Sequence, residues 1–137
     1  MASFIYNSFK EYMGDGTIDM DNDSFKVILL GTGHTPDATN TQYSNISGNE
    51  LANGNGYTTG GNSLSNVVWT RTAGTVKFDA DDPVWTSATF DARYASIFDD
   101  TTANDLLVCL IDFGGTKSVS NGTFTINFHA DGIFTLA

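Results

Sequence analysis

The chain has few basic residues, a single cysteine and no long apolar run, and each shortage excludes a class of protein. Its 137 residues contain six Lys and Arg against sixteen Asp and Glu, which gives a formal net charge of −10 at pH 7. Nucleic acid and anionic membranes both attract basic surfaces, so we expect neither as a partner. The longest apolar run, residues 106–111, is too short to cross a bilayer as a helix.

Residues suited to catalysis are equally scarce. The one cysteine, Cys109, lies inside that apolar run, where we expect it to behave as a small buried hydrophobe and not as a thiolate nucleophile. With only two histidines, His34 and His129, it cannot build a convincing zinc site, and no Gly-x-Ser-x-Gly sequence marks a nucleophilic serine. We therefore predict that the protein is not an enzyme, with no catalytic residue and no cofactor.

One segment has the pattern of a short amphipathic helix. Four apolar side chains recur at helical spacing near the N-terminus: Ile5, Phe9, Tyr12 and Met13. Ser3 is a candidate N-cap, and Gly14 or Gly16 could end the helix. A helix this short is marginal in isolation, so its apolar stripe must dock, either on the core of its own domain or on a neighbouring subunit. We treat residues 1–16 as an N-terminal helical docking segment.

Most of the remaining chain has the pattern of β-strands. Residues 25–30 and 106–113 are apolar on both faces and are predicted to be central strands, the second ending at Gly114 and Gly115. Further strands are predicted by alternation and by turn signals at residues 67–72, 75–79, 84–86, 88–98, 123–128 and 133–136. The chain is therefore predicted to be all-β, a β-sandwich or jelly-roll-like fold of about seven or eight strands with a short N-terminal helix.

Residues 31–66 are the least regular part of the chain. They hold many Gly, Asn and Thr and sustain neither periodicity, apart from a possible helical turn near residues 42–46. Long irregular loops within one domain are often functional, which directs attention to its two aromatic residues, Tyr43 and Tyr57. No repeat or linker divides the chain, so residues 1–137 are predicted to form a single β domain.

Three acidic clusters were considered as sites. Asp19, Asp21 and Asp23 alternate as at the start of an EF-hand calcium loop, but Ser24 replaces the required Gly and Leu30 replaces the required Glu. These three residues are therefore only weak metal candidates, and a solvated acidic turn is the prediction. The other clusters lie in predicted turns, where Asp is common for local reasons: Asp79, Asp81 and Asp82, and Asp99, Asp100 and Asp105.

Several segments resemble a family of small virion structural proteins of tailed bacteriophages. The opening, residues 3–19, is similar to the short amphipathic start, Gly-Asp-Gly turn and acidic stretch of that family. The resemblance continues over nearly the whole chain, at residues 25–30 (FKVILL), 56–61 (GYTTGG), 78–82 (FDADD), 92–95 (ARYA), 111–114 (IDFG) and 121–124 (NGTF). It implies a structural role in the virion and implies no catalytic residues.

Within that resemblance the leading hypothesis is a capsid decoration, or cement, protein that binds the outer capsid surface and stabilises the shell. Its expected partners are the major capsid protein and further copies of itself, as a dimer or trimer. It would be made in the host cytoplasm and located on the capsid surface of the virion. The interface candidates are the apolar residues of the N-terminal segment and the tyrosines of the long loop: Phe4, Ile5, Phe9, Tyr12, Met13, Tyr43 and Tyr57.

Two alternatives remain open. The first is a tail, neck or fibre-base structural protein of the same virion. The second is a carbohydrate-binding β-sandwich module, in which exposed aromatic rings would stack on sugars. Its candidate residues are Trp69, Trp85, Tyr43 and Tyr57.

Overall fold

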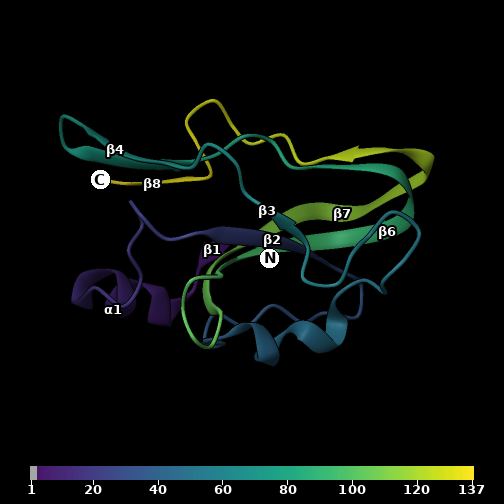
Figure 1. Cartoon of the computed structure of the whole chain (residues 1–137), viewed down its shortest axis with the longest axis horizontal. Helices are drawn as coiled ribbons and strands as arrows, with labels where there is room; N and C mark the ends of the chain where they lie inside the picture. The colour runs from purple at the N-terminus through teal and green to yellow at the C-terminus, as the bar shows by residue number, and fades with distance from the viewer. Residues whose placement is uncertain (1–2) are drawn as a thin grey trace.

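The computed structural model describes residues 3–137 and consists of two antiparallel β-sheets and one short α-helix, α1 (Figure 1). One sheet has the strand order β1-β7-β6-β2-β3, and the other has the order β4-β5-β8. The strands are β1 (Phe4–Ile5), β2 (Phe25–Leu30), β3 (Asn62–Ser63), β4 (Val68–Thr72), β5 (Thr75–Asp79), β6 (Val84–Asp99), β7 (Leu106–Thr125) and β8 (Phe134–Leu136). The prediction of an all-β, sandwich-like fold with a short N-terminal helix is confirmed.

The long strands β6 and β7 pair with each other and curve from the five-stranded sheet towards the layer of β4 and β8 (Figure 1). Their register shifts at four places, so extra residues bend the pair. Ser87 and Asn121 lie near the end of the pair where β6 begins and β7 ends, and both have a positive φ of 48°. Such irregularities let one strand pair turn a corner between two layers.

β6 and β7 are each continuous, whereas the sequence pattern predicts shorter pieces, and this part of the prediction is wrong. Residues 84–86 and 88–98 form one strand, and so do residues 106–113 and 123–125. Gly114 and Gly115 do not end β7. Between the pairs Tyr94–Asp112 and Ala92–Lys117, β7 contains three more residues than β6, and this excess forms a bulge in which Gly114 has φ 81°.

The N-terminal segment differs in detail from its prediction. Phe4 and Ile5 are in β1, which pairs with Leu110 and Cys109 of β7, and α1 spans Asn7–Asp15. Ser3 therefore does not cap the helix; its hydroxyl oxygen accepts the backbone N–H of Asp112 instead, at 2.9 Å. Gly16 ends the helix, as one of the two predicted alternatives. Residues 1 and 2 of the predicted segment 1–16 lie outside the described residues.

The stretch 31–66 is mostly irregular, as predicted, but it is not free of regular structure. Two 3₁₀ turns, Tyr43–Asn45 and Ser47–Asn49, include the helical turn expected near residues 42–46. The two-residue strand β3 was not predicted, and it pairs with the buried strand β2. β2 thus lies between β6 and β3, inside the sheet as its apolar pattern indicates.

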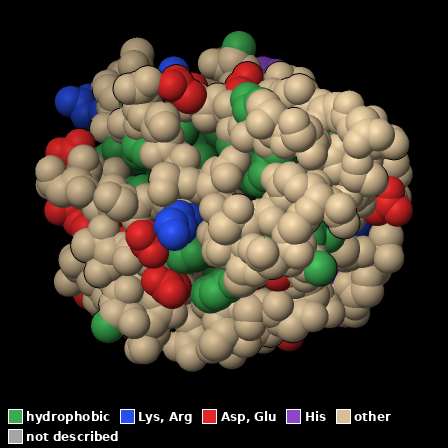
Figure 2. Space-filling view, turned by 45° about the vertical axis from the view of Figure 1, so that its right-hand side comes forward, with side chains coloured by type: hydrophobic (Ala, Val, Ile, Leu, Met, Phe, Trp, Pro, Cys, Tyr) green, Lys and Arg blue, Asp and Glu red, His purple; other side chains and the backbone are tan. Residues whose placement is uncertain are grey.

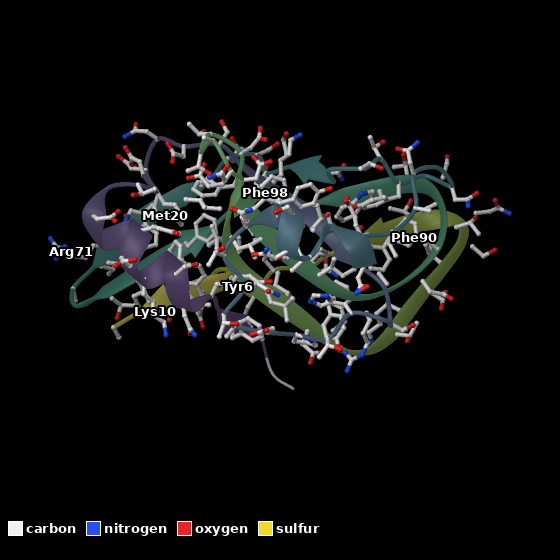
Figure 3. The ribbon with its side chains drawn as sticks, turned by 90° about the horizontal axis from the view of Figure 1, so that it is seen from below. Tyr6, Lys10, Met20, Arg71, Phe90 and Phe98 are labelled. Carbon is white, nitrogen blue, oxygen red and sulfur yellow. The ribbon has the colours of Figure 1, made fainter. Side chains whose placement is uncertain are left out.

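The core is rich in aromatic contacts at both ends of the molecule. At one end Phe78 packs edge-on against Phe25 and is tilted on Phe134. At the other end a separate group surrounds the β6–β7 pair: Tyr57, Trp85, Phe90, Phe113 and Phe124. Figure 3 shows Tyr6 and Phe98 near the middle and Phe90 away from the α1 end. Among residues 3–137 no helix has the length and apolarity needed to span a membrane.

Candidate functional site

The predicted interface residues divide into two that are buried and five that reach the surface. Phe9 is fully buried and packs edge-on against Phe134, so the stripe of α1 docks on the domain's own core. Tyr57 is also buried, at 2% exposure. Both are therefore unavailable as interface residues in this fold, which corrects the prediction for them. The other five are half-buried and reach the surface: Phe4, Ile5, Tyr12, Met13 and Tyr43.

The two loop tyrosines share one carboxylate. The hydroxyl groups of Tyr43 and Tyr57 both donate hydrogen bonds to the Glu50 carboxylate. The backbone N–H of Gly60 donates to the same carboxylate at 2.8 Å. The Tyr57 hydroxyl oxygen also accepts the N–H of Leu29 in β2, at 3.1 Å. Burial and the bonds to Glu50 raise the pKa of both phenols far above the usual range. This cluster ties the long loop to the sheet, so it is a structural feature.

The aromatic residues considered for sugar binding do not form an exposed platform. Trp85 is 3% exposed and stacks on buried Tyr57. Trp69 is half-buried and packs edge-on against Phe78 and Phe134. Tyr43 stacks on Phe98 with its ring centroid 5.0 Å away. These rings are used in packing, which removes the observation on which the carbohydrate hypothesis depended.

A groove lies where the N-terminal strand meets the C-terminal segment. It has a volume of about 280 Å³ and lies between β1, β7 and the residues that lead into β8. Its lining is mainly apolar and half-buried, from Phe4, Ile5, Ile111, Phe128, Ile133 and Phe134. An apolar groove of this size can receive a few side chains of another protein.

The groove continues along the outer edge of β7. A second cavity of about 470 Å³ shares Ile111 and Ile126 with the first, and it extends past Phe113 and Val119. Residues 3–6 and 41–42 bond to this edge of β7 as far as Asp112, and beyond Asp112 no strand among residues 3–137 pairs with it. An uncovered strand edge beside apolar side chains is a common docking surface for a partner protein. We call the groove and this edge together the β7 surface.

Charge distinguishes the β7 surface from the rest of the molecule. Figure 2 shows one face of the protein, on which acidic side chains greatly outnumber basic ones and hydrophobic atoms reach the surface in furrows. The two cavities of the β7 surface are lined by no acidic residue, and Lys117 is exposed at the second one. This surface therefore has little of the negative charge that would oppose contact with an acidic partner.

The structure brings two of the three acidic clusters together. The N–H of Asp100 donates to the carbonyl of Ser24 at 2.8 Å, which places the turn containing Asp19, Asp21 and Asp23 beside the turn that follows Asp99. Asp19 accepts the N–H groups of Asp21 and Asn22, as expected for a local acidic turn. In the described part of the chain no group of three acidic, histidine or cysteine side chains is arranged to hold a metal ion.

The cysteine and the two histidines lie in three different environments and form no common site. Burial raises the pKa of the Cys109 thiol to about 12, which makes its thiolate scarce at neutral pH. His34 is 7% exposed and packs edge-on against Tyr94, while burial lowers its pKa. His129 is exposed and lies beside Asp131. The burial of Cys109 was predicted from the sequence, but the burial of His34 was not.

Neither the β7 surface nor the Glu50 cluster was predicted from the sequence. The alternating residues 123–128 were all assigned to one strand, whereas β7 ends at Thr125 and Phe128 is left free to line the groove. Glu50 is the only glutamate in the long loop. A single glutamate in a polar stretch was the one feature of the sequence that could have indicated its role.

Comparisons with known proteins add no relative. The chain matches no protein-family model, no curated protein and no solved structure.

Proposed function

We propose that the protein is a structural component of a tailed-phage virion, and specifically a decoration protein that binds the outer face of the capsid shell. The sequence resemblance described above supports the virion role. The observation that supports a binding role is the β7 surface, which combines an apolar groove with an uncovered strand edge. Its occupant in this proposal is a subunit of the shell.

The mechanism is stabilisation by selective binding to the assembled state. A protein that binds the closed lattice but not free subunits shifts the assembly equilibrium towards the lattice. Each contact can be modest, because many copies act on one particle. The net charge of −10 keeps the free protein soluble and repels it from the packaged nucleic acid.

Two of the half-buried apolar residues of the N-terminal segment belong to this surface, and two do not. Phe4 and Ile5 line the groove from β1, whereas Tyr12 and Met13 lie on α1 outside it. A shell subunit seated in the groove would therefore contact β1 and the C-terminal segment together. This arrangement places β1 and the segment that leads into β8 at one proposed interface.

The test begins with purified virions, in which the ratio of this chain to the major shell subunit is measured by quantitative mass spectrometry. A decoration protein is expected at a copy number comparable with that of the shell subunits, and on the outside of the particle. A handful of copies at the tail or neck would overturn the decoration role and support the alternative position in the virion.

A second measurement tests the β7 surface itself. Purified protein is added to shells assembled without it and to unassembled shell subunits. Binding to shells alone is expected, and Phe128→Glu should weaken it at least tenfold because a charge would be buried in the groove. Val68→Lys is the matched control, since Val68 is 38% exposed on β4 away from the groove. Equal binding by both folded variants would show that the groove is not the interface.

A further inference from the structure

The acidic turn and the β6–β7 turn are joined at their bases. We define the acidic turn as residues 19–24 and the β6–β7 turn as residues 100–105. Phe25, at the start of β2, pairs with Asp99, the last residue of β6. Beyond that pair, the Asp100 N–H donates to the Ser24 carbonyl, and the Ser24 N–H donates to the Thr101 hydroxyl, each at 2.8 Å.

The carboxyl group of Asp99 lies at this junction and is fully buried, with 0% exposure. One of its oxygens, Oδ1, accepts the N–H of Thr101 at 2.9 Å. The other, Oδ2, is buried and meets no N–H or O–H donor among residues 3–137. The group that it faces is the carboxyl of Asp23, whose Oδ2 already accepts the N–H of Asp19 at 3.0 Å.

Two carboxyl groups in contact cannot both be ionised without a large cost, because like charges repel and a buried charge loses its hydration. A single proton placed between them solves both problems, since it neutralises one group and supplies the missing donor. Burial, followed by the hydrogen bond and the charge of Asp23, raises the pKa of Asp99 to about 8. The two clusters provide no third ligand that would favour a metal ion over a proton.

Most of the other charged groups near Asp23 and Asp99 are acidic, and one lysine partly balances them. Asp100 is exposed on the β6–β7 turn, and Asp105 on the same turn has a pKa raised by burial and by the charge of Asp100. Lys26 of β2 lies close enough to oppose that shift at Asp105. The local field is therefore mainly negative, which favours retention of the shared proton.

We propose that Asp23 and Asp99 share one proton, and that losing this proton to solvent at alkaline pH releases the acidic turn from the β6–β7 turn. With both groups ionised, their repulsion acts across the hydrogen bonds that join Ser24 to Asp100 and Thr101. Met20, at 4% exposure, is held in the core by the acidic turn, so release of the turn also exposes an apolar side chain. The carboxyl pair therefore holds the two turns together in a pH-dependent way. This proposal does not depend on the proposed role in the virion.

The first test is a titration of aspartate side-chain carboxyl carbons by NMR in the full-length protein. One carboxyl is expected to titrate near pH 8, and its signal should be absent in Asp99→Asn. In Asp23→Asn the same signal should titrate at lower pH, because the second carboxyl is gone. If every carboxyl titrates below pH 6, the shared proton is excluded.

The second test is amide hydrogen exchange at Ser24 and Asp100, corrected for the intrinsic effect of pH. Protection of both amides should fall at least about tenfold between pH 7 and pH 9.5 in the native sequence, since each pH unit above the pKa changes the protonated population tenfold. Asp99→Asn keeps the shape of the side chain, can donate a hydrogen bond to Asp23, and should lose less than about twofold in the same range.

Asp91→Asn is the matched control, because Asp91 is exposed on the same strand, β6. It should behave like the native sequence. Equal pH profiles for the native sequence and Asp99→Asn would overturn the proposal. So would a rise in melting temperature on adding millimolar Ca²⁺ at pH 7.5 that Asp99→Asn abolishes, since the pair would then hold a cation in place of a proton.

Discussion

The hydroxyl group of Tyr57 donates a hydrogen bond to a carboxylate oxygen of Glu50 at a distance of 2.5 Å. Because the same hydroxyl oxygen accepts the N–H of Leu29, one side chain joins the long loop to the middle of β2. A loop of this length is costly to order, and a bond to a charged group offsets more of that cost than a neutral bond would. The irregular stretch 31–66 is therefore held in one conformation by a few buried contacts.

Tyr57→Phe should lower the free energy of unfolding by about 1–3 kcal/mol, because it leaves the Leu29 N–H without its acceptor and removes one donor from Glu50. Denaturant unfolding followed by circular dichroism measures this change. Tyr12→Phe, on the half-buried face of α1, should cost less and serves as the control. Equal losses in the two variants would show that the Glu50 cluster does not hold the loop.

The sequence predicted the strands well where burial alone decides them, and poorly where backbone geometry decides them. β2 and the first part of β7 are apolar on both faces, and both lie inside the five-stranded sheet as expected. The glycine pair at 114 and 115 was interpreted as a strand end, although it forms a bulge. A Gly-Gly step fits both outcomes, and only pairing with β6, distant along the sequence, distinguishes them.

The candidate sites depended even more on distant contacts. The triplet of Asp19, Asp21 and Asp23 was visible as a pattern, but the residue that matters to Asp23 is Asp99, from another cluster. Phe9 and Tyr57 were reasonable interface candidates by residue type, and their burial follows from which strands cover them. Spacing along the chain carries no information on such pairs, so the β7 surface was also beyond prediction.

Cys109 should be protected from alkylation in the folded protein. Its side chain is buried and burial raises its pKa to about 12, so at pH 8 both access and thiolate fraction are low. Iodoacetamide labelling followed by mass spectrometry should be at least ~1000-fold slower in the native protein than in urea, because only an opened chain reacts. Rapid labelling without denaturant would show that the edge of the sheet near β1 opens readily.

Asp99 should make the protein less stable as the pH rises from about 4 to about 8. Its folded pKa is about 8 and its ordinary value is 3.8, so in this window the folded state holds a proton that the unfolded chain releases. The free energy of unfolding should fall by ~1.4 kcal/mol per pH unit from this group alone. Asp99→Asn should remove that slope and raise the melting temperature at pH 8.

Asp112 provides a contrast of opposite sign. Its bond from the Gly114 N–H and its ion pair with Arg93 lower its pKa, so its contribution is present above the ordinary value and is lost as the pH falls below about 4. Asp112→Asn should therefore reduce stability at neutral pH and leave the slope between pH 4 and pH 8 unchanged. If Asp99→Asn retains that slope, another group is responsible for it.

Gly61 should be the glycine least tolerant of substitution, because two costs coincide there. Its φ is +74°, and an added Cβ would lie 1.9 Å from the carbonyl oxygen of Val27 in β2. Gly61→Ala should therefore cost more than ~2 kcal/mol, since a backbone atom in a buried strand cannot move aside.

Gly114→Ala separates the two costs. Gly114 has a similar φ, +81°, but an added Cβ there meets no atom within 4 Å. Its loss of stability should be about 1 kcal/mol, from backbone strain alone. Thermal and denaturant unfolding of the two variants should give a clear difference, and exchange of the Leu64 N–H, which donates to Phe25 across the end of β3, should rise only in Gly61→Ala. Equal stability would mean that β3 can lift from β2 at little cost, so the long loop would be anchored by its other contacts, which include the Glu50 cluster and the bond from the Leu51 N–H to Leu29.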